Sequence, residues 1–313
     1  MKKKAIIDIG TNTFNLLVVQ IESNNKLNVL YEEKLPVKLG KGSMQDGILK
    51  PDSMERAVVA INKHIDTSKK YKTENIDAFA TSAVRSAKNK DVFLDKIKNE
   101  CGIDIKIISG DEEALYIYNG IINAVKLQNN INYLILDIGG GSNEFILCNT
   151  NGILWKRSYD LGVARLLEKV NPHDPVTPDD IDKVHKITVS LIHELDENCK
   201  KFKPAVLIGA SGSFETYSSI ILHEKFGNDD LIKQNTWYEI MTEDFYKLHD
   251  KLIRSAVADR KKMKGLPVWR IDMIVLAAVF TEFILERYNL KKIIFSDYAL
   301  KEGVAYGFSI VNG

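Results

Sequence analysis

The sequence contains few of the features that mark secreted or membrane-spanning proteins. Its 313 residues include three cysteines, far apart and without a CxxC spacing, which argues against a disulfide framework or a structural zinc site. No apolar stretch reaches the roughly 20 residues that a membrane span needs, and the basic start at residues 1–4 lacks the apolar segment of a signal peptide. We therefore expect a protein of the reducing cytoplasm with no membrane partner.

An excess of charge of one sign is also absent. Lysine and arginine total 43 and aspartate and glutamate total 42, for a formal net charge of +1. This balance argues against a surface coated with positive charge, so we expect no stable nucleic-acid partner. With seven prolines and no linker rich in proline or serine, any domains are expected to pack closely.

One pattern occurs twice in the chain, over residues 5–40 and again over residues 133–162. Each copy reads as a strand, a tight glycine turn, a second strand, another turn and a third strand, and ends on Leu-Gly. The second turns fall at Asn24-Asn25 and Asn151-Gly152. Two copies of one unit in a chain of this length predict two related domains.

Helix and strand patterns alternate after each copy, which predicts an α/β architecture. In the first half we expect helices over 51–70, 89–102 and 111–125, and strands over 76–80 and 103–108. In the second half we expect one helix from 178 to about 200, helices over 212–222, 242–257, 271–288 and 300–308, and strands over 204–208 and 293–295.

The first glycine turn places Asp8 at the end of a buried strand, before Gly10 and small polar side chains. Such a turn can direct backbone N–H groups and hydroxyls at a phosphate while the acid holds a metal ion or its water. A hairpin in which Gly10 and Asn12 serve turn geometry alone is an equally good interpretation.

The second glycine turn carries a stronger signal. Three consecutive glycines, residues 139–141, are entropically costly unless the backbone comes very close to another group. A hairpin there would bring Asp137 and Glu144 together around a cation. A wide flexible turn is the less favoured alternative.

Three further segments leave predicted strands. Residues 209–213 open a helix, the geometry in which a helix N-terminus receives an anion, although such a loop can also be simple punctuation between strand and helix. Arg85 could clamp phosphate as a planar fork, but a lone arginine is more often a surface residue. The acids at 111–113 are explained by the helix dipole, and one of them could instead be a general base toward water.

In this order and spacing, the motifs resemble the exopolyphosphatase / guanosine pentaphosphate phosphohydrolase (Ppx/GppA) family of the actin-like ATPase (ASKHA) superfamily. The resemblance covers essentially the whole chain and includes segments 7–13, 81–85, 108–114, 137–144, 209–213, 270–272 and 296–304. It implies an α/β fold of two actin-like (ribonuclease H-like) domains with a central cleft. Domain I would comprise residues 1–125 and 299–313, and domain II residues 126–298.

The resemblance also implies an activity. The protein would release the terminal phosphate from inorganic polyphosphate, the 5′ γ-phosphate of guanosine pentaphosphate, or both, by water attack assisted by Mg²⁺ or Mn²⁺. Glu113 would orient or deprotonate the water, Glu144 would share the catalytic work, and Asp8, Asp137 and Glu144 would surround the metal. The implied phosphate-binding residues are Gly10, Thr11, Asn12, Thr13, Arg85, Gly140, Gly141, Ser142, Asn143, Gly209, Ser211, Gly212 and Ser213.

The chain departs from the family pattern at three points. Leu115 and Lys38 stand where many relatives have arginine, which removes bidentate phosphate recognition. The extra C-terminal part of longer relatives, which resembles HD-type hydrolases, is expected to be missing. The resemblance therefore predicts the reaction type and leaves open the substrate preference and the handling of long chains.

Other interpretations remain open. A kinase or ATPase of the same superfamily would share the phosphate loops, although segment 108–114 favours the hydrolase, and a non-catalytic sensor of polyphosphate or alarmone would need no turnover. A filament-forming protein is disfavoured, and a homodimer is common in the family. We expect no catalytic histidine, tryptophans in a core or interface, and a solvated basic run at 260–264 that could guide a polyanion if it faces the cleft.

Overall fold

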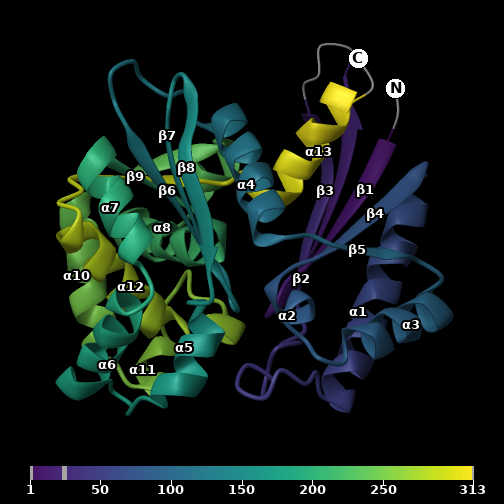
Figure 1. Ribbon diagram of the computed structural model, residues 1–313, viewed down its shortest axis with the longest axis horizontal. Coiled ribbons are helices and arrows are strands. Elements are labelled where there is room, and N and C mark those ends of the chain that lie inside the picture. The colour runs from purple at the N-terminus through teal and green to yellow at the C-terminus, as the bar shows by residue number, and fades with distance from the viewer. Residues whose placement is uncertain (1–2, 23–26, 312–313) are drawn as a thin grey trace. The chain divides into compact units, whose positions relative to one another are not determined.

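A computed structural model describes residues 3–22 and 27–311 (Figure 1). The chain divides into two compact units: unit 1 comprises Met1–Gly120 with Leu300–Gly313, and unit 2 comprises Ile121–Ala299. The sequence analysis placed the corresponding domain boundaries at 125/126 and 298/299. The turn expected at Asn24-Asn25 lies outside the described residues.

The sheet of unit 1 has the strand order β3-β2-β1-β4-β5. Its strands are β1 (Lys3–Ile9), β2 (Thr13–Ile21), β3 (Leu27–Pro36), β4 (Asn75–Ala80) and β5 (Ile105–Ile107). β1, β2 and β3 form an antiparallel meander, whereas β4 is parallel to β1 and β5 is parallel to β4. Ala5, Ile6 and Ile7 are completely buried, because elements cover both faces of this sheet.

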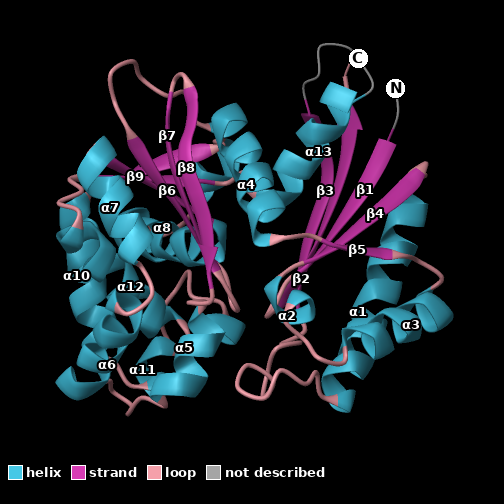
Figure 2. Ribbon diagram, viewed as in Figure 1, coloured by secondary structure: helices cyan, strands magenta, loops and turns pink. Residues whose placement is uncertain are grey.

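The helices of unit 1 lie on both faces of its sheet (Figures 1 and 2). They are α1 (Pro51–Lys70), α2 (Ser82–Arg85), α3 (Lys90–Cys101), α4 (Gly110–Ala124) and α13 (Leu300–Val311). α1 begins with a proline at its first position, where the missing N–H costs nothing. α13 packs against β1 and β2 and meets α4 so closely that a Cβ on Gly303 would lie 1.6 Å from the carbonyl oxygen of Tyr116.

The sheet of unit 2 repeats that of unit 1 and extends it by one strand. Its order is β10-β11-β9-β6-β7-β8, from β6 (Tyr133–Ile138), β7 (Asn143–Asn149), β8 (Gly152–Tyr159), β9 (Val206–Ala210), β10 (Trp237–Ile240) and β11 (Lys292–Ser296). β6, β7 and β8 form the antiparallel meander, and β9 and β11 continue the parallel part. The duplication that the sequence predicts is therefore present in the topology, and only the antiparallel edge strand β10 was not expected.

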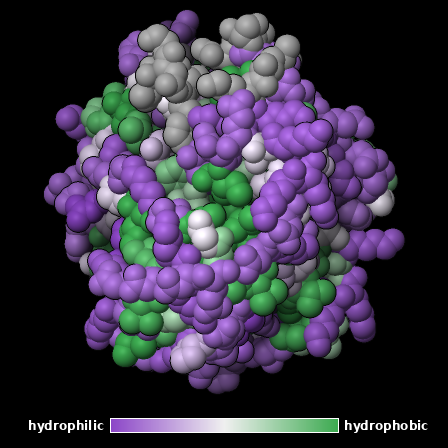
Figure 3. Space-filling view, turned by 90° about the vertical axis from the view of Figure 1, so that its right-hand side faces the viewer, coloured by the Kyte–Doolittle hydropathy of each residue, from purple (hydrophilic) through white to green (hydrophobic). Residues whose placement is uncertain are grey.

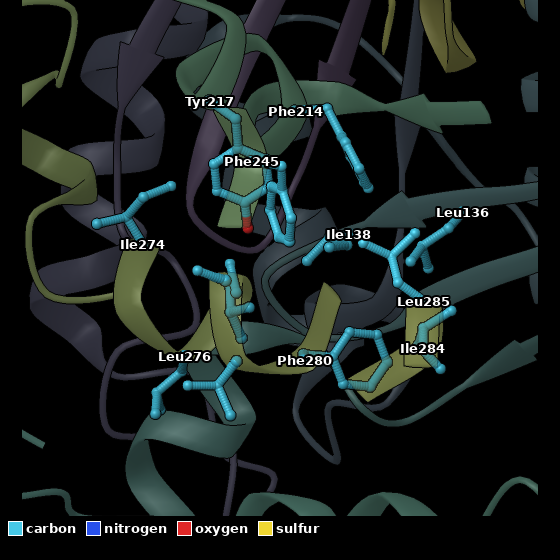
Figure 4. Packing of buried hydrophobic residues seen from close by; sticks show 14 of the residues in the cluster. Leu136, Ile138, Phe214, Tyr217, Phe245, Ile274, Leu276, Phe280, Ile284 and Leu285 are labelled. Atoms are coloured by element: carbon cyan, nitrogen blue, oxygen red, sulfur yellow. The ribbon is translucent and has the colours of Figure 1, made fainter. Parts of the chain in front are cut away.

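Helices pack against this second sheet, and together with it they form the hydrophobic core of unit 2. They are α5 (Val163–Val170), α6 (Pro178–Val189), α7 (His193–Phe202), α8 (Ser211–Phe226), α9 (Asp230–Gln234), α10 (Thr242–Arg254), α11 (Val257–Arg260), the 3₁₀ turn η1 (Val268–Arg270) and α12 (Ile274–Arg287). Figure 4 shows Phe214 and Tyr217 of α8 beside Phe245 of α10, with Phe280 of α12 near Leu136 and Ile138 of β6. α12 is buried over most of its length, as expected for a helix that is apolar all round.

One expectation for the helices of unit 2 was wrong. The helix expected from 178 to about 200 is two helices, α6 and α7, separated at residues 190–192. The buried positions 184, 188, 192, 195 and 199 keep the spacing of one continuous helix, so the pattern gave no sign of the break. The sequence also missed α5, which begins directly after the Leu161-Gly162 turn.

The basic run at 260–264 is only partly solvated. Arg260 is 4% exposed and donates hydrogen bonds to the carbonyl oxygen of Ile271 (3.0 Å) and to Asp174 (2.8 Å). Arg260 is thus a structural residue, which corrects the expectation of a wholly solvated run. The three lysines of the run are exposed.

No helix in the described part of the chain is long and apolar enough to cross a membrane. On the face shown in Figure 3, hydrophilic side chains surround a central apolar area. Large apolar side chains exposed in unit 1 include Val59 on α1 and Val92 on α3. Of the tryptophans, which we expected in a core or interface, Trp155 packs against the core of unit 2, whereas Trp237 is 45% exposed.

Candidate active site

The glycine turn of unit 2 brings two acids together. β6 and β7 pair so that Asp137 lies directly opposite Glu144. The turn between them closes with a hydrogen bond from Gly139 N–H to the Ser142 carbonyl oxygen (3.1 Å), and a Cβ on Gly139 would lie 2.6 Å from that oxygen. Asp137 and Glu144 are 5% and 1% exposed, so the hairpin buries two neighbouring carboxyl groups.

Without a cation, burial and the neighbouring carboxyl group disfavour ionisation of this pair. Burial, followed by the charge of Glu144, raises the pKa of Asp137 to about 7, against the lowering effects of a hydrogen bond from Ser211 and of the nearby Arg270. A cation beside the pair would favour the ionised form of both carboxyls. Carboxylate oxygens are the protein ligands that Mg²⁺ and Mn²⁺ prefer, and Mg²⁺ usually takes one or two of them and completes its shell with water and phosphate. The donor set therefore fits such an ion.

Three serine hydroxyls hold the two acids. Ser211 Oγ donates to Asp137 Oδ2 (2.7 Å). Ser142 Oγ (2.7 Å) and Ser158 Oγ (2.6 Å) both donate to Glu144 Oε1. Ser142 and Ser211 belong to the predicted phosphate-binding set, whereas the sequence gave no sign of Ser158, which lies on β8.

The carbonyl oxygens of the glycine turn accept hydrogen bonds from the neighbouring helix. The N–H groups at the start of α5 donate to them: Val163 to Gly139 (3.0 Å) and Ala164 to Gly140 (2.9 Å). The contact is so close that a Cβ on Gly162 would lie 2.4 Å from the backbone of Gly140. These bonds satisfy the free N–H groups of the helix and fix the conformation of the turn.

The loop before α8 is shaped by packing. Ser211 has a left-handed backbone conformation (φ +65°), which is uncommon for a residue with a Cβ. A Cβ on Gly212 would lie 1.3 Å from Nη2 of Arg270, and a Cβ on Gly209 would lie 2.1 Å from the ring of Phe214. Both glycines are thus required by close neighbours, and the phosphate roles of Gly209, Gly212 and the buried Ser213 stay predictions.

Asn143 has an observed structural role. Its side chain is completely buried and its Nδ2 donates to the carbonyl oxygen of Leu161 (2.9 Å). It therefore ties the start of β7 to the segment before α5. Its assignment to phosphate stays a prediction, as do those of Gly140 and Gly141.

The glycine turn of unit 1 has the same backbone form. Gly10 N–H donates to the Thr13 carbonyl oxygen (3.1 Å), and Asp8 lies opposite Asn15, whose Nδ2 donates to Asp8 Oδ2 (2.8 Å). The turn is held from outside, because Thr11 and Asn12 accept backbone hydrogen bonds from the segment 37–40. Arg56 braces this segment through the carbonyl oxygens of Val37 and Lys38 (2.8 and 3.2 Å).

Arg85 and Glu113 form an ion pair in unit 1. Arg85 Nη1 donates to Glu113 Oε2 (2.7 Å) and to the carbonyl oxygen of Ile108 (3.1 Å), and Glu113 is 6% exposed. Neighbouring Glu112 instead accepts from Ser109 N–H (2.9 Å), which with Lys106 lowers its pKa to about 2. Glu112 thus has the role at the helix start that the dipole interpretation assigns to such acids, and Glu113 is the buried acid beside an arginine.

The predicted metal residues come from both units. Asp137 and Glu144 adjoin one another in unit 2, whereas Asp8 belongs to unit 1. Within the described residues, no three or more histidine, cysteine, aspartate or glutamate side chains are placed to hold a metal ion. A metal site that includes Asp8 therefore stays a prediction.

Comparison with known proteins places this chain in a family. Residues 17–309 match the Ppx/GppA phosphatase family. The chain is 32% identical over 316 residues to a bifunctional 3-dehydroquinate synthase/phosphatase of Fusobacterium nucleatum, covering 96% of this chain and 46% of that protein. It is 25% identical to a putative exopolyphosphatase of Haemophilus influenzae, covering 98% of this chain and 91% of that one. The chain thus spans about half the length of the first relative and most of the second.

A solved structure is also similar to this chain over nearly its whole length. The crystal structure of an exopolyphosphatase from Cytophaga hutchinsonii is 35% identical, has a TM-score of 0.93, and aligns over 98% of this chain and 97% of that one. The chain belongs to the Ppx/GppA phosphatase family and has its fold of two actin-like α/β domains.

Proposed function

We propose that the protein hydrolyses the terminal phosphoanhydride bond of inorganic polyphosphate, of guanosine pentaphosphate at its 5′ γ-phosphate, or of both, with a divalent cation bound at Asp137 and Glu144. The buried pair of carboxyl groups in the glycine turn carries this proposal. Phosphoryl transfer needs positioning and charge neutralisation more than covalent chemistry. Burying two acids side by side costs free energy unless a cation offsets their charge.

Asp137 and Glu144 would hold Mg²⁺, with Mn²⁺ as a substitute. Such an ion supplies neutralisation of the charge on the phosphate oxygens. The protein contributes the fixed geometry of the two carboxylates, because serine hydroxyls hold one oxygen of each. The predicted phosphate-binding groups would hold the terminal phosphate so that water attacks in line.

Glu113 would act on the attacking water. The water oxygen bonds to the terminal phosphorus, the P–O bond to the rest of the substrate breaks, and the leaving chain takes that electron pair. Glu113 accepts the proton that the water loses. Arg85 holds Glu113 in place and is also a fork-shaped donor of the kind that binds phosphate.

The test measures phosphate release from long polyphosphate, short polyphosphate, guanosine pentaphosphate and ATP in parallel, with and without Mg²⁺ or Mn²⁺. We expect metal-dependent release from polyphosphate, guanosine pentaphosphate or both. A preference for ATP would favour a kinase or ATPase and contradict the proposal. Substrate binding without release would indicate a sensor.

Glu113→Gln tests the role of the base. We expect this variant to fold and to bind phosphate but to lose turnover by about 10²- to 10⁴-fold, the usual contribution of general base catalysis. Glu112→Gln is the matched control, because Glu112 is the adjacent acid and bonds to Ser109. Near-normal activity of the Glu113 variant would remove Glu113 from this role.

A further inference from the structure

A row of residues crosses the sheet of unit 2 at the level of the acid pair. Ala210 on β9 pairs with Asp137, Asp137 with Glu144, and Glu144 with Ser158 on β8. Ser211 follows Ala210 and donates to Asp137, while Ser158 donates to Glu144. Each acid therefore has a serine hydroxyl on the side away from the other acid.

Glu144 is held more firmly than Asp137. Its Oε1 accepts two hydroxyl hydrogen bonds, from Ser142 within the turn and from Ser158 on the next strand. Hydrogen bonds to a carboxylate are shorter and stronger than neutral ones. Two donors, one from the turn and one from the next strand, fix the direction of a side chain with three rotatable bonds better than one donor does, since rotation would break both bonds.

A β-bulge places Ser158 opposite Glu144. The β7–β8 register shifts between Leu147 and Cys148. If the pairing of Cys148 with Ile153 continued without this shift, Glu144 would face Arg157 instead of Ser158. Bulges re-aim side chains next to functional sites, and a one-residue slip would move the hydroxyl to the other face of the sheet.

Resting on the proposed function, we propose that Ser158 is a positioning residue that, together with Ser142, fixes the Glu144 carboxylate in the direction needed to bind the divalent cation. Ser158 itself touches neither substrate nor metal in this role. Removal of its hydroxyl frees Glu144 to rotate while the fold of the sheet stays in place. The ligand pair then spends less time arranged for the metal, and metal affinity falls.

The test measures Mn²⁺ binding to metal-depleted protein by electron paramagnetic resonance. We expect Ser158→Ala to weaken Mn²⁺ binding about 10-fold, the lower end of what loss of an outer-shell partner costs. Ser158→Thr keeps a hydroxyl on a strand that accepts β-branched residues, and we expect it to restore binding to within about 2-fold of the original protein, a small fraction of the outer-shell effect.

Ser218→Ala is the matched control for loss of a buried hydroxyl. Ser218 also belongs to unit 2 and is completely buried, and its Oγ makes no hydrogen bond among the described residues. We expect this variant to bind Mn²⁺ normally. Equal weakening in the Ser218 and Ser158 variants would overturn the proposal, as would unchanged Mn²⁺ binding in Ser158→Ala.

Two more variants, Ser142→Ala and the double variant Ser142→Ala/Ser158→Ala, keep the test decisive if Ser158→Ala folds poorly. Because the two hydroxyls share one acceptor oxygen, their effects on Mn²⁺ affinity should be non-additive, and strict additivity would contradict the shared role. Metal-dependent kinetics of Ser158→Ala add a second readout: the Mn²⁺ concentration for half-maximal rate should rise, with little change in the rate at saturation. If the original protein bound Mn²⁺ but released no phosphate, the proposed function would fail and the positioning role could still be scored.

Discussion

The glycine hairpins of the two units have the same backbone form and differ in the residue that lies opposite their aspartate. In unit 1 Asp8 faces Asn15, which donates a hydrogen bond to it. In unit 2 Asp137 faces Glu144. The first pair carries one negative charge that an amide already satisfies, whereas the second places two carboxyl groups together.

The difference extends to the neighbouring strand. Asn15 pairs with Lys34 on β3, and Glu144 pairs with Ser158 on β8, both beyond equivalent β-bulges. A lysine is a cation built into the chain, whereas a serine directs the carboxylate and leaves its charge in place. One repeated scaffold thus places an acid beside an amide in unit 1 and two facing carboxyl groups in unit 2, which we propose to hold a cation.

The largest effect is expected when the second hairpin is given the pairing of the first. Glu144→Gln replaces the acid pair with an acid and an amide, and we expect phosphate release to fall on the order of 10³-fold, since an electrostatic contact of the reaction is lost. Without metal, the free energy of unfolding should rise because a buried charge is removed. Tryptophan fluorescence in urea would measure this, since Trp155, Trp237 and Trp269 all lie in unit 2. Activity within tenfold of the original would contradict the comparison.

The Leu-Gly pairs that end the two repeats should differ in their tolerance of alanine. A Cβ on Gly162 would lie 2.4 Å from the backbone of Gly140 and Gly141, whereas a Cβ on Gly40 would meet side chains of Thr11 and Met44. We expect Gly162→Ala to cost about 3 kcal/mol in the free energy of unfolding and Gly40→Ala about 1 kcal/mol, because side chains move aside more easily than backbone. Equal losses in the free energy of unfolding, measured by urea titration, would show that backbone and side-chain neighbours accommodate the added methyl group equally well.

The reverse exchange should be milder. Asn15→Asp would give unit 1 two facing carboxyls and remove the donor to Asp8, and we expect it to lower the stability of unit 1 by about 1–2 kcal/mol. Unit 1 contains no tryptophan, so hydrogen exchange of β1 and β2 amides is the suitable measurement. Asn15→Ala, which removes the donor without adding charge, is the control, and equal losses in the two variants would show that repulsion contributes nothing.

Acidification should change the contributions of His64 in unit 1 and Asp137 in unit 2 in opposite directions. Burial lowers the pKa of His64, whose ring lies against the Phe14 carbonyl oxygen in unit 1. A group with a lowered basic pKa loses its stabilising contribution as pH falls below its ordinary value of 6.5. The pKa of Asp137 is instead raised from 3.8 to about 7, so the metal-free unit 2 gains stability as pH falls from about 7 toward 4.

Hydrogen exchange between pH 7.5 and 5.5 would test this difference. We expect opening of β2 to become easier and opening of β6 to become harder as pH falls. His64→Phe should remove much of the change in unit 1, and Asp137→Asn much of the change in unit 2. Unchanged pH trends in both His64→Phe and Asp137→Asn would contradict the assignment of these groups.

The sequence predicted those parts of the fold that depend on short stretches of chain. The glycine turns with their flanking apolar strands specify the two hairpins locally, and the Asp137–Glu144 pairing follows from turn length. The helix break before α7 was missed because the burial spacing continues across it. α5 was missed because contacts with the glycine turn, not its own pattern, define its start.

Residues brought together across longer stretches were beyond the sequence. Ser158 reaches Glu144 only because a bulge shifts the register, and residue counting from the Asn151-Gly152 turn would have selected Arg157. Arg85 and Glu113 were each chosen for a separate role, and their ion pair joins positions 28 residues apart. The burial of Arg260 was likewise hidden, because a basic run gives no sign of which side chain turns inward.

The return of α13 to unit 1 has a consequence for synthesis of the protein on the ribosome. α13 packs against β1 and β2, yet all of unit 2 is translated between them. Unit 2 therefore has every residue of its own sheet before unit 1 receives its closing helix. A ribosome that stalls before residue 300 would release unit 1 with this apolar side of its first strands uncovered, the kind of surface by which incomplete chains aggregate or bind chaperones.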